Sequence, residues 1–135
     1  MELIFKEDTH QYFVDGVEYP SVTRILADMG FINSAWFTEE SRIRGTYCHL
    51  ACHLDDTGEL DEDSLDPVIK PYLEAYRSFK ADTGLVVSRS EEPMFSETYR
   101  FAGTPDKRGG FPDKFSAIVD LKSGAIAPWV AIQTA

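Results

Sequence analysis

The chain has 135 residues, of which 43% are hydrophobic and 27% charged, and this composition predicts a single domain, residues 1–135, with a modest core. No apolar run approaches the roughly 20 residues of a membrane span, and no basic region precedes an apolar one at the N-terminus, so we expect a cytoplasmic protein with no membrane partner. The net charge of −10 argues against binding of nucleic acid by bulk electrostatics, but it does not exclude a nuclease, because metal-binding carboxylates are counted in it.

The first half of the chain is expected to form a β-hairpin and three helices, at residues 3–20, 21–30, 33–53 and 67–80. Asp15-Gly16 is a strong hairpin turn signal, and Ser21 is a suitable cap for the first helix. Gly45 is a weak point within the second helix. The acidic run at residues 55–66 separates the last two helices and is expected to be a solvated loop.

The second half of the chain is expected to form three strands and a final helix. The strands are predicted at residues 85–95, 99–106 and 115–122, and the helix begins at Pro128. Residues 107–114 contain two glycines and a proline, which is typical of a turn.

The third expected strand ends in an acid and a base two residues apart. Because successive strand side chains point to opposite faces, Asp120 and Lys122 share one face. Charges on a strand this apolar are costly unless something pairs with them. A divalent cation held by Asp120 and Asp106, with Lys122 beside it, would be such a partner.

These residues resemble the PD-(D/E)XK nuclease superfamily, in particular its RecB-like and phage-exonuclease branch. Pro105-Asp106 and Asp120-Leu121-Lys122 match its two central elements. The outlying matches are Ser21-Val22-Thr23, Arg44-Gly45-Thr46 followed by His49, Glu91 (with Glu92 next best), Phe101-Ala102-Gly103-Thr104, and Gln133. Each match is weak by itself, since Asp-x-Lys occurs by chance in many strands, but the ordered set is specific.

The resemblance implies an α/β fold with a restriction-endonuclease-like core, in which a small mixed β-sheet is flanked by helices. It implies a deoxyribonuclease that uses Mg²⁺ or Mn²⁺ to hydrolyse phosphodiester bonds. An exonuclease fits better than a sequence-specific endonuclease, because no segment is typical of a base-reading module. DNA would be the partner, and the setting would be recombination or repair in a bacterial cell or a phage-infected host.

The resemblance also assigns roles to individual residues. The metal ligands would be His49, Asp106, Asp120 and the backbone carbonyl of Leu121. Glu91 would complete the metal shell or bind a second ion, and Lys122 would orient the attacking water and offset negative charge. The substrate contacts would be Arg44, at a phosphate, and Gln133, which would act at the catalytic site or on DNA.

One departure from the family pattern concerns the C-terminus. The Tyr of the family's Gln-x-x-x-Tyr motif would fall four positions after Gln133, beyond Ala135, and the usual final helix and strand are also missing. We therefore expect either a truncated form of a longer protein or a short variant in which a protein partner, or another copy of the chain, supplies these elements.

Two other interpretations are open. Cys48 and Cys52 lie one helical turn apart and, with the neighbouring histidines, suggest zinc, but buried thiols are favoured because one straight helix cannot surround an ion. Two cysteines are too few for the four-cysteine iron–sulfur cluster of some relatives, so none is expected. The alternative function is a catalytically silent acidic interaction domain or DNA-mimicking inhibitor, which would spread its acids in rows rather than gather a few in a cleft.

Overall fold

The computed structural model describes residues 1–32, 37–124 and 130–134, and it has the mixed α/β composition that the sequence predicts. Within these residues the strands form three small antiparallel sheets rather than the single mixed sheet we expected. The cause is connection length, because strands joined by short turns pair antiparallel whereas parallel pairing needs a long crossover. Two predicted helix starts, residues 33 and 128, lie outside the described residues.

The N-terminal sheet confirms the predicted hairpin and adds a third strand. It contains β1 (Leu3–Lys6), β2 (Gln11–Val14) and β3 (Val17–Tyr19), in that order. Asp15 and Gly16 have φ values of 49° and 81°, as the two central residues of a type I′ turn require. The next helix, α1 (Val22–Asp28), is capped as predicted, since the Ser21 side chain accepts a hydrogen bond from the backbone N–H of Arg24.

The helical part of the chain contains α2 (Glu39–Thr57), the 3₁₀ helix η2 (Glu62–Ser64) and α3 (Lys70–Thr83). Helix α2 runs through Gly45 without a break. Its buried residues Cys48, Ala51 and Cys52 pack in hydrophobic clusters with residues of and beside α3, and this burial outweighs the roughly 1 kcal/mol cost of a helical glycine. The two cysteines are free and buried, as expected.

A bent antiparallel ribbon forms the centre of the molecule. Its strands are β4 (Val86–Ser90), β5 (Met94–Ser96), β6 (Phe101–Gly103) and β7 (Lys107–Gly110). Strand β4 pairs with β7, and β5 pairs with β6, so the predicted continuous strand 85–95 is interrupted after Ser90. The Glu91 N–H donates to the Asp106 backbone oxygen at 2.9 Å across this interruption. Strand β8 (Ser116–Val119) then pairs with β7, and α4 (Val130–Gln133) follows.

The predicted turn at residues 107–114 was wrong for its first four residues, which form β7. The reason is the role of its glycines. A Cβ atom on Gly109 would overlap the backbone oxygen of Val86 on β4, so glycine here permits close approach of two strands beside a bulge. A sequence pattern cannot distinguish such a glycine from one that makes a turn.

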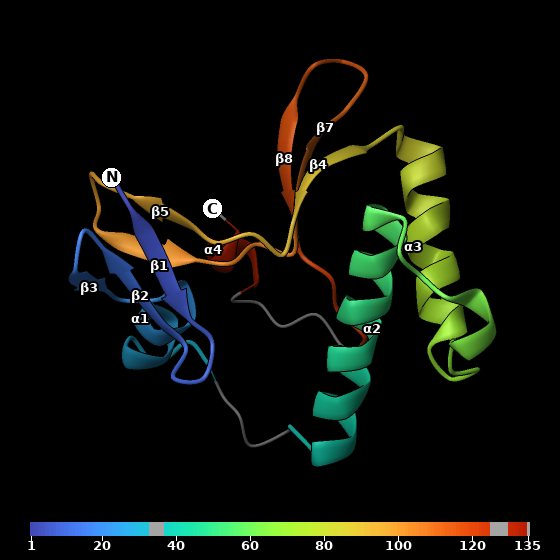
Figure 1. Ribbon diagram of the computed structural model, residues 1–135, viewed down its shortest axis with the longest axis horizontal. Helices are drawn as coiled ribbons and strands as arrows, with labels where there is room; N and C mark the ends of the chain where they lie inside the picture. The colour runs from blue at the N-terminus through green and yellow to red at the C-terminus, as the bar shows by residue number, and fades with distance from the viewer. Residues whose placement is uncertain (33–36, 125–129, 135) are drawn as a thin grey trace.

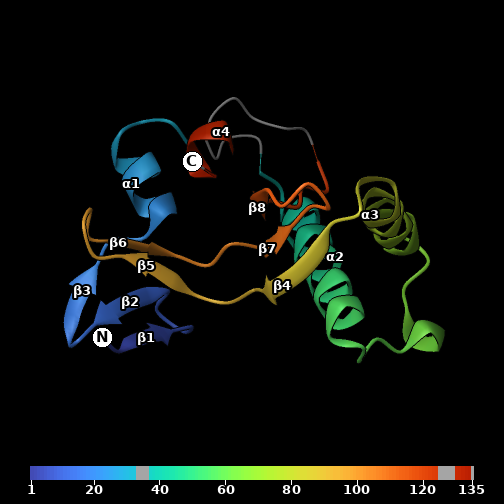
Figure 2. The same ribbon diagram turned by 90° about the horizontal axis from the view of Figure 1, so that it is seen from above.

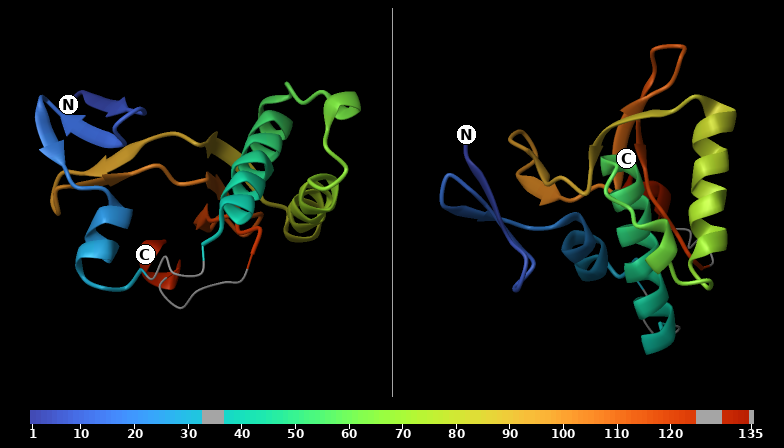
Figure 3. Two further views of the ribbon diagram at one scale, coloured as in Figure 1. Left: turned by 90° about the horizontal axis from the view of Figure 1, so that it is seen from below. Right: turned by 45° about the vertical axis from the view of Figure 1, so that its right-hand side comes forward.

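The ribbon connects the two ends of the molecule. The N-terminal sheet and α1 lie at one end, and α2 and α3 lie at the other, as Figures 1 and 2 show. Helix α2 contacts both α3 and β4, while α4 lies against α1 (Figure 3). Among the described residues, no helix has both the length and the apolar character needed to span a membrane.

Replacing Gly109 by Ala should lower the free energy of unfolding by about 1–3 kcal/mol, because the new methyl group would force β4 and β7 apart. Gly110→Ala is the matched control, since its Cβ would lie 3.6 Å from the Phe115 oxygen, an ordinary contact, and we expect a change within about 0.5 kcal/mol. Urea unfolding measures both variants. Equal stability of the two would contradict the close strand approach.

Candidate metal centre

Three side chains from three elements converge where the ribbon is interrupted. His49 comes from the middle of α2, Glu91 follows β4, and Asp106 precedes β7. His49 Nδ1 lies 3.1 Å from Asp106 Oδ1 and 3.4 Å from Glu91 Oε1. One nitrogen or oxygen atom from each residue lies within 4.8 Å of the other two. This donor set, one imidazole and two carboxylates, suits a divalent cation such as Mn²⁺ or Mg²⁺.

The backbone at Glu91 is strained in a way that helps to form this cluster. Its φ of 51° lies in the left-handed region, which costs a residue other than glycine about 1–2 kcal/mol. The hydrogen bond from Glu91 N–H to Asp106 O keeps the two residues paired at the interruption. The strain therefore accompanies a local geometry that brings two carboxylates to one place.

The backbone of Leu121 holds Asp106 and His49 together. The Leu121 N–H donates to Asp106 Oδ2 at 2.7 Å, and the Leu121 carbonyl lies 3.0 Å from His49 Nε2. Nε2 is the ring nitrogen that does not face the carboxylates. At this distance the Leu121 carbonyl can orient the His49 ring, as in many metal-binding histidines whose second nitrogen donates to a backbone carbonyl. Its expected role as a metal ligand stays a prediction.

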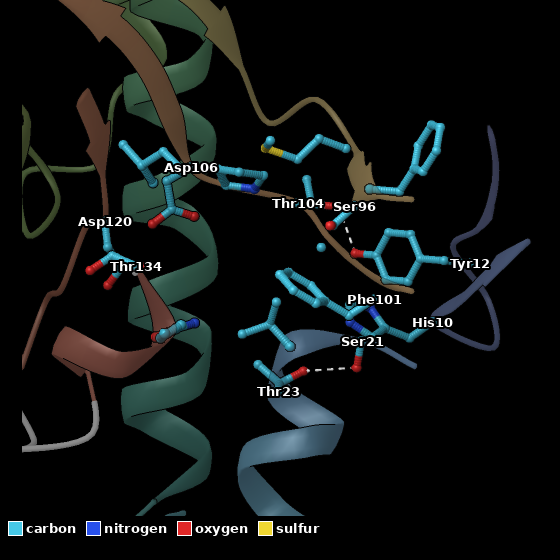
Figure 4. A pocket seen from close by; sticks show the side chains of 17 residues that line it. His10, Tyr12, Ser21, Thr23, Ser96, Phe101, Thr104, Asp106, Asp120 and Thr134 are labelled. Carbon is cyan, nitrogen blue, oxygen red and sulfur yellow. Dashed lines mark hydrogen bonds between the residues drawn. The ribbon is translucent and has the colours of Figure 1, made fainter. Parts of the chain in front are cut away.

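Asp120 and Lys122 lie beside this cluster. The strand ends at Val119, before both residues, so the strand that was expected to place them on one face is shorter than predicted. Their side chains form an ion pair, with Lys122 Nζ 2.8 Å from Asp120 Oδ2. Asp120 is not within the group of three mutually close ligand atoms, although it lines a cavity together with Asp106 (Figure 4). Its side chain interacts with that of Asp106, so Asp120 lies beside the cluster, and its expected role as a metal ligand stays a prediction.

The electrostatics of the cluster favour a positive charge at its centre. Hydrogen bonds with Asp106, and then Glu91, raise the pKa of His49 to about 10. Burial raises the pKa of Asp106, but the hydrogen bonds from His49 and Leu121 outweigh it and bring the pKa below its usual value. Burial, with repulsion from Asp106, raises the pKa of Asp120 despite the nearby Lys122. Carboxylates that stabilise an imidazolium would also stabilise a cation.

The two predicted substrate contacts, Arg44 and Gln133, are both partly buried. Arg44 lies on α2 beside Gly124, and its Nε atom has no hydrogen-bond partner among the described residues. Gln133, on α4, lines the same cavity as Asp106 and Asp120, and its Oε1 atom also lacks a partner in the described part of the chain. The structure therefore brings Gln133 near the carboxylates and places Arg44 one helical turn before Cys48.

Sequence reasoning missed a buried polar network directly behind the cluster. Lys107 is fully buried, and its Nζ lies 2.8 Å from Asp56 Oδ2 and 2.6 Å from Ser90 Oγ. The Tyr76 hydroxyl donates to Asp56 Oδ2 at 2.6 Å, and His53 Nδ1 lies 2.8 Å from Ser90 Oγ.

The network fixes the chain neighbours of two candidate ligands, because Lys107 follows Asp106 and Ser90 precedes Glu91 in the chain. Neither Lys107, which lies in a glycine-containing segment predicted to be a turn, nor Asp56, one of several acids in the acidic run, indicated this pairing in the sequence.

Comparison of the chain with protein-family models gives no match, and comparisons with curated proteins and with solved structures give none either.

Asp56→Asn should lower the free energy of unfolding at pH 7 by about 3–5 kcal/mol, because it leaves the buried Lys107 ammonium without its counter-ion. Burial raises the pKa of Asp56, but hydrogen bonds from Lys107, Lys80 and Tyr76 outweigh it and lower the pKa below 3.8. The ionised form therefore contributes stability above that pH, and this contribution is lost as the pH falls through the lower folded-state pKa. Denaturant unfolding should show the difference from wild type shrinking in acid; a constant difference would contradict the pairing.

Mn²⁺ should raise the midpoint of thermal unfolding of the wild-type chain, because a ligand that binds only the folded state stabilises it by about 2.7 kcal/mol at a hundred times its Kd. Asp106→Asn should weaken Mn²⁺ binding at least tenfold, because even the loss of a residue that only supports a metal ligand weakens metal binding by about that factor. Asp82→Asn, an exposed change of the same chemistry on α3, is the control. Titration with Mn²⁺ against an EDTA baseline measures all three proteins, and an unchanged response of Asp106→Asn would contradict the site.

Proposed function

We propose that this chain is a metal-dependent deoxyribonuclease domain of the PD-(D/E)XK superfamily, in its RecB-like and phage-exonuclease branch, with a restriction-endonuclease-like core. The observation that carries the proposal is that His49, Glu91 and Asp106 lie together where the ribbon is interrupted. The first and last of these residues are 57 positions apart in the chain. These are residues that the family motifs select, and they come from three different elements. Chance placement of an isolated motif would not produce such a cluster.

The cluster accounts for the main needs of phosphodiester hydrolysis. A bound Mg²⁺ or Mn²⁺ supplies a Lewis acid that polarises a phosphoryl oxygen and makes water a better nucleophile. His49, Glu91 and Asp106 hold the cation. Lys122 lies at the edge of the site, where its ammonium group can hold the attacking water and offset negative charge that develops on the phosphate. Water adds to phosphorus, the bond to the leaving sugar oxygen breaks, and that oxygen takes up a proton.

The net charge of the chain also favours an exonuclease over an enzyme that recognises a DNA sequence. With a net charge of −10, the chain would bind DNA through the cation and a few local basic groups such as Arg44, and not through a broad basic surface. Such binding discriminates little between sequences. We place the activity in DNA recombination or repair in a bacterial cell or a phage-infected host.

The first two acids of the acidic run argue against the alternative function as a DNA mimic. Asp55 pairs with Arg77 at 2.6 Å, and Asp56 pairs with Lys80 and Lys107, each at 2.8 Å. Carboxylates that are neutralised within the fold are not presented to a basic partner. The ion pairs instead join the end of α2 to α3 and β7.

The direct test is digestion of end-labelled linear DNA and of closed circular DNA with Mg²⁺ or Mn²⁺. We expect the linear DNA to be degraded and the circular DNA to resist, with EDTA abolishing activity. Lys122→Ala should reduce the rate about 10²–10³-fold, as loss of one charge-stabilising group does in other enzymes. Lys70→Ala, at an exposed position on α3, is the matched control and should retain wild-type activity. A rate that neither Lys122→Ala nor Asp106→Asn changes would refute the assignment.

A further inference from the structure

A cavity of about 260 Å³ begins at the two carboxylates of Asp106 and Asp120 and leads away from the metal centre. The N-terminal sheet, α1, the β5-β6 part of the ribbon and α4 all contribute to its walls. In Figure 4 the carboxylates lie on one side, and His10, Phe101 and several hydroxyl groups lie on the other. A group that entered this cavity would therefore be held within reach of whatever is bound at the cluster.

The lining of the cavity is suited to an uncharged, flat and partly polar group. Its walls include the aromatic rings of Phe101 and Tyr12, and the Tyr12 hydroxyl is bonded to Thr104 Oγ1 at 2.7 Å. The hydroxyls of Ser21 and Thr23 lie 3.3 Å apart at its edge. No lysine or arginine is among the described residues that line it, so the cavity offers phosphate little attraction. Aromatic faces with scattered hydroxyl groups are typical of sites that stack and orient a nucleobase.

Gln133 contributes a polar side chain to this cavity. Its Oε1 atom is buried without a partner among the described residues, and Gln133 lines the cavity. A buried acceptor without a partner is costly, so one that borders a cavity indicates a ligand with a donor group. A base amino or imino group, or a sugar hydroxyl, is a donor of this kind.

We infer that the cavity is the subsite for one nucleoside, namely the nucleoside attached to the phosphate that is cleaved. The inference rests on the proposed nuclease function, because the phosphate is what would place this nucleoside at the cluster. The base stacks against Phe101, and the Gln133 amide with the Ser21 and Thr23 hydroxyls contacts its polar edge or its sugar. A base held inside a cavity cannot stay stacked and paired in a duplex, so the nucleoside enters unpaired. The site therefore favours frayed ends and single strands.

The test compares single-stranded oligonucleotides that differ only in one terminal base. One substrate is intact, and two others carry an abasic tetrahydrofuran residue at the 3′ or the 5′ end. The wild-type chain should release the first nucleotide from one of the abasic substrates about tenfold more slowly than from the intact one, since stacking of one base is lost. Thr23→Phe, which fills the cavity edge, should remove this difference. Met29→Phe, an exposed change at the end of the same helix, should preserve it.

A binding measurement separates failure of the subsite from failure of the nuclease assignment. The probe is the 5′-monophosphate of 2-aminopurine deoxyriboside, whose fluorescence falls when its base stacks. Wild type and Met29→Phe should quench it saturably, and Thr23→Phe should not. Cleavage of all three oligonucleotides at equal rates would overturn the subsite and leave the nuclease assignment standing. Quenching that Thr23→Phe abolishes, without cleavage in any metal, would support the subsite and refute the nuclease; absence of both would refute both.

Discussion

The buried carboxylate of Asp106 is the group on which the arrangement of the site depends. Burying an ionised carboxyl group is unfavourable by several kcal/mol unless hydrogen bonds and a counter-charge replace the lost water. Here the Leu121 N–H and the His49 ring provide both, at 2.7 Å and 3.1 Å. Because these partners come from the segment just after β8 and from the middle of α2, satisfying one carboxylate draws the ribbon, the edge strand and the long helix together. The candidate metal centre is the place where they meet.

A second buried charge supports this arrangement from behind. The fully buried ammonium group of Lys107 lies next to Asp106 in the chain, and its pairing with Asp56 and Ser90 anchors β7 and β4 to the end of α2. Breaking such a pair is strongly destabilising, so the backbone on both sides of the ribbon's interruption has little freedom to move. The positive φ of Glu91 persists in this setting because its surroundings determine the local conformation. Rigid support of this kind is what a site needs to hold a cation in fixed geometry.

The sequence correctly predicted structural elements that depend on local signals, and it selected site residues by the order of the family motifs. Asp15-Gly16 and Ser21 act locally, and the structure confirms both. His49, Glu91 and Asp106 were selected by their order in the chain, and the structure places them together. The β7 strand and the Lys107 pair were missed because a glycine that permits close strand approach looks like a turn glycine, and because a buried ion pair depends on contacts 51 positions apart. The position of Asp120 beside the cluster, and the contacts of the Leu121 backbone with Asp106 and His49, depend on three-dimensional geometry that no spacing rule contains.

The central claim is that His49, Glu91 and Asp106 together bind a divalent cation. The most direct measurement is an anomalous difference map from crystals of the chain grown with MnCl₂, recorded on the low-energy side and the high-energy side of the manganese absorption edge. The account predicts one strong peak, present only above the edge, within coordination distance of His49 Nδ1 and of carboxylate oxygens of Glu91 and Asp106. A well-ordered site with no such peak, or manganese bound only away from Asp106, would contradict it.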